Sequence, residues 1–111
     1  MTEPTSTQKN SRRQVLEEFV AQKPDDAFSR YGLALECMNS GDSAAADAHF
    51  RALIERNARY IPGYQMYGQF LARERRIEEA RRVLTAGIAA ADKAGNSHAR
   101  SEMESFLNDL G

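Results

Sequence analysis

The sequence predicts an all-α protein whose helices pair as antiparallel hairpins, and two observations lead to this fold class. Apolar residues recur at three- and four-residue spacing through most of the chain, whereas valine, isoleucine and threonine are sparse and never alternate with polar residues, so no strand is predicted. The predicted helices are about four turns long and very short links join them, which favours antiparallel neighbours.

The first predicted helix covers residues 12–22 and follows a polar segment. Residues 1–10 lack an apolar pattern, and we expect them to form a disordered N-terminal tail. Ser11 can cap the helix and Pro24 stops it. The apolar residues at helical spacing are Val15, Leu16, Phe19 and Val20.

The second predicted helix has a clear start and a clear stop. Asp25 and Asp26 can each cap its N-terminus, because a carboxylate accepts a hydrogen bond from an amide of the first turn. The helix runs to about Ser40 and ends before Gly41, a residue type that favours the position just past a helix C-terminus.

The third and fourth helices are predicted from similar boundaries. Ser43 can cap the third helix, which ends near Asn57. Tyr60, Ile61 and Pro62 open the fourth helix, because proline is tolerated in a first helical turn.

The last two helices complete the set of about six. The fifth starts near Ile77 and runs through Lys93 to Gly95, which is a favourable C-terminal glycine. Asn96 or Ser97 caps the sixth helix. The apolar face of the sixth helix consists of Met103, Phe106, Leu107 and Leu110.

An internal repeat relates the middle four helices. A shift of 34 residues aligns residues 24–57 with residues 58–91 without a gap. Identities are few, but small residues fall opposite small ones and bulky apolar residues opposite bulky apolar ones. The matched pairs are Ala46 with Ala80, Ala52 with Ala86, Ile54 with Ile88, Leu33 with Tyr67, Ala34 with Gly68, Cys37 with Leu71, and Phe50 with Leu84.

In this pattern the chain resembles the tetratricopeptide repeat family, whose unit is a 34-residue helix pair. The resemblance covers 68 of the 111 residues. In the first repeat the matching residues are Pro24, Leu33, Ala34, Gly41, Asp42, Ala46 and Phe50. In the second they are Tyr64, Tyr67, Gly68, Leu71, Ala80 and Leu84.

Four positions depart from the family pattern. Arg30 stands where the family favours a large aromatic residue, and Ala58 replaces the proline that closes the first repeat. Gly87 stands where alanine is usual. Arg75 replaces the turn glycine before the fifth helix.

Small residues are expected where paired helices cross closely. Ala34 and Gly68 supply them on first helices, and Ala46 and Ala80 on second helices. Larger residues at these positions would cost roughly 1–3 kcal/mol each through overpacking. We therefore interpret the alanine-rich stretch after residue 42 as a packing device.

The domain organisation follows from the repeats. Two repeats leave apolar faces on both neighbouring positions, and the flanking helices can cover them. We expect one domain over residues 11–111, with repeats at 24–57 and 58–91 and a capping helix at 97–110. The outer face of that cap carries Arg100, Glu104 and Asp109.

Composition limits the classes of function. Fifteen basic and sixteen acidic residues give a net charge of −1, so general attraction to nucleic acid is not expected. The single cysteine, Cys37, excludes an intrachain disulfide and a cysteine-based zinc cluster. No apolar run approaches the ~20 residues of a membrane span, and the start has no signal-peptide core. We expect a cytoplasmic protein.

No catalytic, metal or cofactor site is predicted, and we do not expect an enzyme. His49 and His98 are the only histidines, and neither is surrounded by metal-ligand spacing. Asp47 and His49 lie two residues apart and so point to different sides of a helix. We interpret His49 as solvent-facing and Cys37 as a buried member of an apolar stripe.

Arginines concentrate in residues 72–82, ARERRIEEARR. One interpretation is a basic patch for an acidic partner. We favour a solvated helix face in which Glu78 pairs with Arg81 and Arg82 across one turn, with Glu74 offsetting further charge.

A second apolar stripe on the second helix is the more informative feature. The resemblance implies that this side of the first helix of each repeat lines a concave groove that takes an extended peptide or a helix. The apolar stripe consists of Phe28, Tyr31, Leu35 and Met38. The matching polar row in the second repeat is Gln65, Gln69 and Arg73.

These residues predict a non-enzymatic protein–protein interaction module whose groove binds a segment of an unidentified partner. The family version that grips chaperone C-terminal tails uses lysine and asparagine here, so the sequence does not favour that ligand. One alternative is self-association, with the apolar stripe buried in a homodimer. Another is that the stripe packs on the N-terminal helix.

Overall fold

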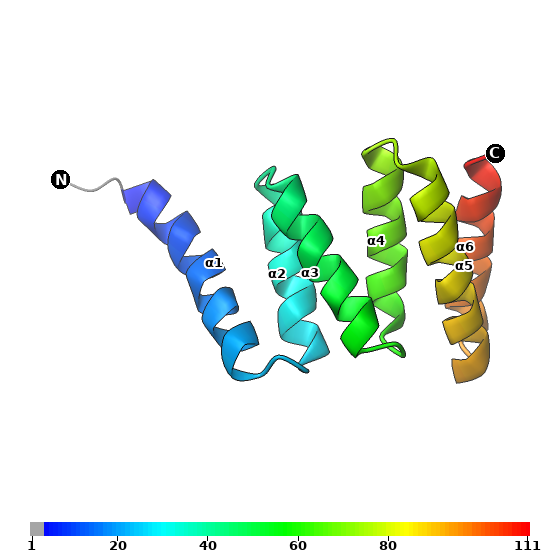
Figure 1. Cartoon of the computed structure of the whole chain (residues 1–111), viewed down its shortest axis with the longest axis horizontal. Helices are drawn as coiled ribbons and strands as arrows, with labels where there is room; N and C mark the ends of the chain where they lie inside the picture. Colours follow the sequence, from blue (N-terminus) through cyan, green and yellow to red (C-terminus); the bar gives the residue numbers. More distant parts are fainter. Residues whose placement is uncertain (1–3) are drawn as a thin grey trace. The chain divides into compact units, whose positions relative to one another are not determined.

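Six α-helices follow one another in the computed structural model, which describes the backbone of residues 4–111 and the side chains of residues 12–111 (Figure 1). No strand occurs over these residues, so the predicted all-α class is confirmed. The helices are α1 Pro4–Gln22, α2 Ala27–Asn39, α3 Ser43–Arg56, α4 Ile61–Arg73, α5 Ile77–Ala94 and α6 Ser97–Asp109.

The first helix begins earlier than predicted. α1 starts at Pro4 rather than beside Ser11, so residues 4–10 of the predicted disordered tail continue the helix. Proline fits a first helical turn, and no glycine or proline interrupts the chain between Pro4 and Pro24. Residues 1–3, the rest of the predicted tail, lie outside the described part.

Side-chain caps fix three of the other helix starts. Asp26 accepts a hydrogen bond from the Ser29 amide at 3.1 Å, and Asn96 accepts one from the Ala99 amide at 3.0 Å, as predicted. The predicted cap of α3 was one residue off. Ser43 is the first helical residue, and Asp42 accepts from the amide three residues along the chain at 3.2 Å.

Each of the three turns that follow α2, α4 and α5 contains one residue in the left-handed backbone region. These residues are Gly41, Arg75 and Gly95, with φ angles of 84°, 66° and 71°. In each turn the next amide donates at 2.9 Å to the carbonyl five residues earlier, which is the pattern of a Schellman C-cap. Arg75 therefore adopts the turn geometry of the glycine that it replaces.

Two compact units make up the chain, one ending at Arg56 and the other beginning at Asn57. This boundary lies one residue from the predicted boundary between the two repeats, after Asn57. The assignment of residues 11–111 to a single domain stays a prediction.

In the first unit, α2 packs against both α1 and α3. Leu16 of α1 lies against Gly32, where an added Cβ would sit 3.7 Å from its Cδ2 atom. An ion pair of 3.0 Å between Arg13 and Asp42 also joins α1 to the turn after α2. The buried apolar residues of this unit are Val20, Leu33, Ala34, Cys37, Ala46, Phe50 and Leu53.

In the second unit, α5 packs against both α4 and α6. A Cβ at Gly68 would lie 2.6 Å from Leu84 Cδ2, so α4 and α5 touch too closely there for any side chain. A Cβ at Gly87 would lie 2.6 Å from Tyr64 Cβ and 2.7 Å from Met103 Sδ. The glycine that departs from the family pattern is thus the point where α5 is pressed from two sides.

Candidate functional site

The apolar stripe lies on α2, in the first unit. Phe28 is 76% exposed, and Tyr31, Leu35 and Met38 are half-buried. Burial raises the pKa of the Tyr31 hydroxyl, because the charged phenolate is poorly solvated there.

α1 contacts α2 along the edge that carries Gly32 and Glu36 rather than across Phe28. Leu16 packs beside Gly32, and Arg12 forms an ion pair of 3.8 Å with Glu36. Phe28 therefore offers exposed aromatic surface beside the helix–helix contact.

The polar row lies on α4, in the second unit. Gln65 is half-buried, whereas Gln69 and Arg73 are exposed. Gln65 Nε2 donates a hydrogen bond of 3.1 Å to Glu102 Oε1 of α6, so the row is tied to a helix that the sequence analysis treated only as a cap.

Gln65 and Gln69 form part of the rim of a hollow of about 210 Å³, which we call the polar hollow. Its other lining residues are Leu84, Glu102, Met103 and Phe106. Leu84 and Met103 are almost fully buried and give the hollow an apolar floor. It can hold a small apolar side chain whose backbone meets the two glutamine amides.

Glu102 is a residue of the polar hollow that was not predicted from the sequence. One of its carboxylate oxygens accepts from Gln65, and the other lies 3.2 Å from His98 Nε2. The available signal was the helix spacing: α6 begins 36 residues after α4, and α4 begins 34 residues after α2. By this spacing, α6 corresponds to the first helix of a further repeat.

Two arginines of the arginine-rich segment pair with its own glutamates. Arg76 donates to both carboxylate oxygens of Glu79, at 2.7 and 2.8 Å. Arg81 lies 3.4 Å from Glu78, which is one of the two predicted pairs. This arrangement supports a solvated helix face rather than a patch for an acidic partner.

Neither Cys37 nor His49 belongs to the apolar stripe or the polar row. Cys37 is buried, and burial raises the pKa of its thiol. His49 is half-buried rather than solvent-facing, which corrects the prediction. Burial lowers its pKa, with further lowering from Arg30 and Arg13.

The described residues contain neither a metal-binding cluster nor a membrane-spanning helix. No cluster of three or more histidine, cysteine, aspartate or glutamate side chains has an arrangement suited to a metal ion. None of the described helices is both long enough and apolar enough to cross a membrane.

One residue in the first unit is buried against expectation. Arg30 is 8% exposed, and its guanidinium donates to the Pro24 carbonyl at 3.2 Å while its Nε atom has no hydrogen-bond partner. Burial lowers its pKa. The position that the family gives to a large aromatic residue therefore holds a poorly compensated charge.

Comparison with known proteins identifies the family, although no protein-family model matches the chain. The chain is 30% identical over 95 residues to the TPR repeat-containing protein PA0015 of Pseudomonas aeruginosa, covering 86% of this chain and 90% of that protein. It is similar to a tetratricopeptide repeat domain protein of Salinibacter ruber, with 28% identity and a TM-score of 0.75 over 79% of this chain and 89% of that one.

A third similarity extends to a complex. The TPR2B domain of yeast Sti1, solved with pHsp70, gives a TM-score of 0.81 over 96% of this chain and 85% of that chain. Its sequence identity is 15%, so the likeness shows the fold alone. With the relative from Pseudomonas aeruginosa, these findings place the chain, as its repeat pattern predicted, in the tetratricopeptide repeat family.

Proposed function

We propose that the chain is a non-enzymatic module that binds a segment of a partner protein through the apolar stripe and the polar row. The observation that carries the proposal is that the Phe28 side chain is 76% exposed. It lies on α2 in the same row as three further apolar residues. An exposed row of large apolar side chains marks an interaction surface more often than a solvated face.

Each half has its own chemistry for a partner. The apolar stripe buries apolar side chains, which contributes about 25 cal/mol per Å² removed from water. In the polar hollow, Gln69 and Gln65 can exchange hydrogen bonds with the partner's main chain, and Glu102 favours an N–H or cationic donor. Apolar side chains of a partner fit the apolar stripe, and polar or basic groups fit the polar row.

Two features disfavour an acidic chain terminus as the ligand. The positions at which the chaperone-tail version has lysine and asparagine hold Tyr31, Leu35, Gln65 and Gln69 here, and none of these four is cationic. Glu102 adds a negative charge beside the polar row, which repels a carboxylate.

Selection of peptides from a random display library tests the proposal. The wild-type chain is expected to enrich peptides that share an apolar pattern, and these should lose binding to the double variant Tyr31→Ser/Leu35→Ser. Arg51→Ser, an exposed change on α3, is the matched control and should bind them normally. Failure to enrich any pattern, or equal binding to the double variant, would contradict the proposal.

The same double variant separates the alternatives. If the stripe forms a homodimer seam, the wild-type chain sediments as a dimer and the variant as a monomer. If the stripe packs on α1, the variant loses helical circular dichroism, because the change then removes core contacts.

A further inference from the structure

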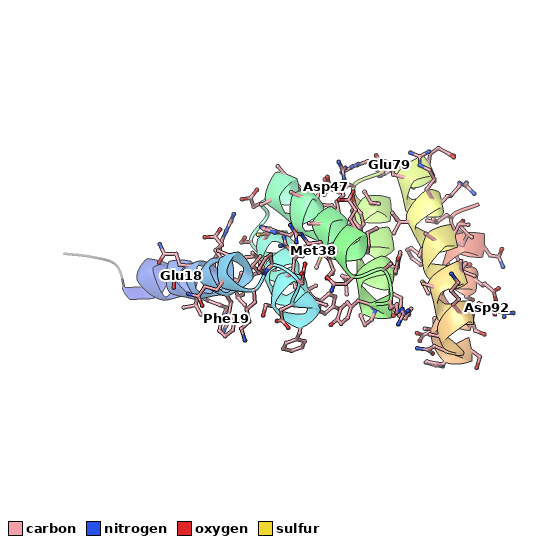
Figure 2. The ribbon with its side chains drawn as sticks, turned by 60° about the horizontal axis from the view of Figure 1, so that its bottom comes forward. Glu18, Phe19, Met38, Asp47, Glu79 and Asp92 are labelled. Carbon is pink, nitrogen blue, oxygen red and sulfur yellow. The ribbon has the colours of Figure 1, made fainter. Side chains whose placement is uncertain are left out.

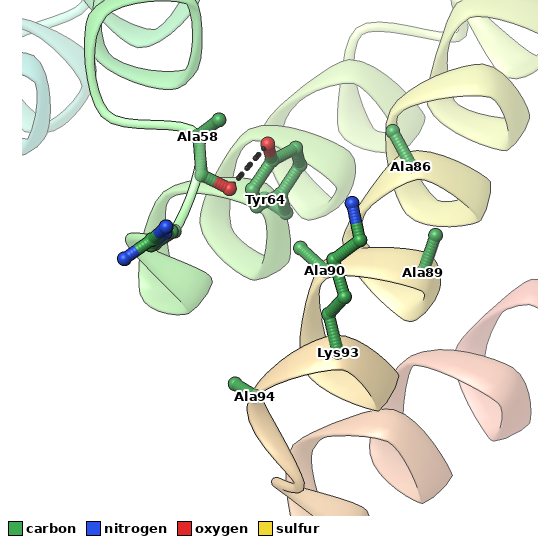
Figure 3. A pocket seen from close by; sticks show the side chains of 8 residues that line it. Ala58, Tyr64, Ala86, Ala89, Ala90, Lys93 and Ala94 are labelled. Atoms are coloured by element: carbon green, nitrogen blue, oxygen red, sulfur yellow. Dashed lines mark hydrogen bonds between the residues drawn. The ribbon is translucent and has the colours of Figure 1, made fainter.

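A second hollow lies in the second unit and shares no residue with the polar hollow. We call it the alanine hollow; its volume is about 730 Å³ (Figure 3). This volume falls within the range of ligand pockets in proteins, roughly 300–1,000 Å³. The lining residues are Ala58, Arg59, Tyr64, Ala86, Ala89, Ala90, Lys93 and Ala94.

The floor of the alanine hollow is apolar and shaped by small side chains. Four alanines of α5 line it with methyl groups, and the Tyr64 hydroxyl donates to the Ala58 carbonyl at 2.8 Å, which fixes the tyrosine (Figure 3). Such a surface can receive bulky apolar side chains from another molecule. Alanine is also the most favourable residue for helix formation, so alanines can occur on an exposed helix face for that reason alone. The apolar floor by itself therefore does not identify a binding site.

The charges on the rim give the hollow its selectivity. Arg59 and Lys93 are both exposed, and neither has an ion pair or hydrogen bond with any described residue. The nearby carboxylate of Asp92 is held by Arg100 at 2.7 Å. No acidic residue lines the hollow, so its rim favours a partner that carries a carboxylate.

α1 exposes a face with the complementary properties. Val15 and Phe19 are 53% and 50% exposed, although they lie one turn apart on the helix that supplies the buried Val20. Glu18 lies three residues from Val15, so the two are neighbours on the helix surface. Glu18 is exposed and has no partner among the described residues, and Figure 2 labels Glu18 and Phe19 on this helix. We call Val15, Glu18 and Phe19 the exposed α1 face.

We propose that the chain self-associates by docking the exposed α1 face of one copy in the alanine hollow of a second copy. Phe19 and Val15 fill the space above the alanine methyl groups, and Glu18 pairs with Lys93 or Arg59 on the rim. This contact explains why Val15 and Phe19 are exposed on α1. It also explains why Arg59 and Lys93 have no acidic partner among the described residues. It is independent of the apolar stripe and the polar row.

Stable interfaces bury about 1,200–2,000 Å² in total, and a single helix in a groove falls at the low end of that range. Each copy carries one exposed α1 face and one alanine hollow. Two reciprocal contacts form a dimer, and one contact per copy forms an extending chain of copies.

Sedimentation velocity of the full chain, from about 1 to 300 µM, spans the affinities expected of weak interfaces. The wild-type chain is expected to associate as its concentration rises. Phe19→Ser removes the main apolar anchor and should weaken association about 30-fold or more. Phe28→Ser is the matched control, because it removes an even more exposed phenylalanine, which belongs to the apolar stripe, and should leave association unchanged.

Charge reversal tests the pairing. Glu18→Lys and the double change Arg59→Glu/Lys93→Glu should each weaken association about three- to tenfold, because they place like charges together. The variant that combines all three changes should recover wild-type association, whereas Glu55→Lys on α3 should have no effect. Circular dichroism confirms that each variant is folded.

Three results would overturn the inference: a wild-type chain that stays monomeric throughout, association that Phe19→Ser leaves intact, or association that the combined charge variant fails to restore. Loss of association in Phe28→Ser but not in Phe19→Ser would assign the interface to the apolar stripe instead.

Discussion

Arg75 occupies a backbone conformation that costs an ordinary residue free energy, so its replacement by glycine should stabilise the protein. Its φ angle is 66°, close to the 84° of Gly41 in the equivalent turn. The left-handed conformation costs an L-residue about 1–2 kcal/mol. Glycine loses more backbone entropy on folding, which offsets about 0.4–1 kcal/mol of that gain. Arg75→Gly should therefore raise the free energy of unfolding by about 0.5–1 kcal/mol.

Little else in the structure changes with this substitution. Arg75 is exposed and makes no ion pair or side-chain hydrogen bond with a described residue. Its amide donates to the Ala72 carbonyl at 3.0 Å, and glycine retains that bond. The opposite change is available in the first unit. An added Cβ at Gly41 meets no atom within 4 Å, so Gly41→Ala adds backbone strain without a clash. After the same entropy offset, it should lower stability by a similar amount.

Urea unfolding followed by circular dichroism measures both effects. The midpoint should rise for Arg75→Gly and fall for Gly41→Ala, with the dependence on urea concentration unchanged. A lower midpoint for Arg75→Gly, together with the expected fall for Gly41→Ala, would refute the reasoning. It would mean that Arg75 makes stabilising contacts that outweigh the backbone strain.

Three further predictions follow from packing and charge. Gly68→Ala should lower the free energy of unfolding by about 1–3 kcal/mol, because the added Cβ would lie 2.6 Å from Leu84. Gly32→Ala is the control, since its Cβ would meet Leu16 at an ordinary 3.7 Å, and it should be neutral or stabilising in the same urea assay. Burial lowers the pKa of His49 below 6.5, so its contribution to stability is full above that value and is lost as the pH falls through the folded pKa. Unfolding midpoints at pH 7 and pH 5 should therefore differ more for the wild-type chain than for His49→Gln, and equal differences would contradict this assignment. Fluorescence anisotropy should detect no binding to random DNA or RNA near physiological salt, because Glu79 pairs with Arg76 and Glu78 with Arg81. Tight, salt-sensitive binding would contradict this prediction.

The helices and their repeat could be predicted because local rules determine them. Asp26 and Asn96 cap α2 and α6 as their residue types suggest, and the 34-residue shift matches residues of similar size. The start of α1 was less predictable. Residues 4–10 have no apolar face, yet no residue in them stops a helix that begins at Pro4.

Parts of the surface could not be predicted because they depend on how helices outside the repeats pack. The polar hollow needs Glu102 and Phe106 of α6, which belong to neither 34-residue repeat. The burial of His49 likewise depends on neighbours outside its own helix, since Arg13 and Arg30 lie near enough to lower its pKa. The conformation of Arg75 could not be predicted from the sequence, because two signals conflict. The repeat spacing requires a left-handed residue at this turn, whereas arginine rarely adopts that conformation.

Nuclear magnetic resonance titration of the ¹⁵N-labelled chain with a library-selected peptide tests the proposed binding surface most directly. We expect the largest shift changes at the amides of Phe28, Tyr31 and Leu35 on α2, and at Gln65 and Gln69 on α4. Changes confined to α5 around the alanine hollow, or to α1, would contradict binding through the apolar stripe and the polar row.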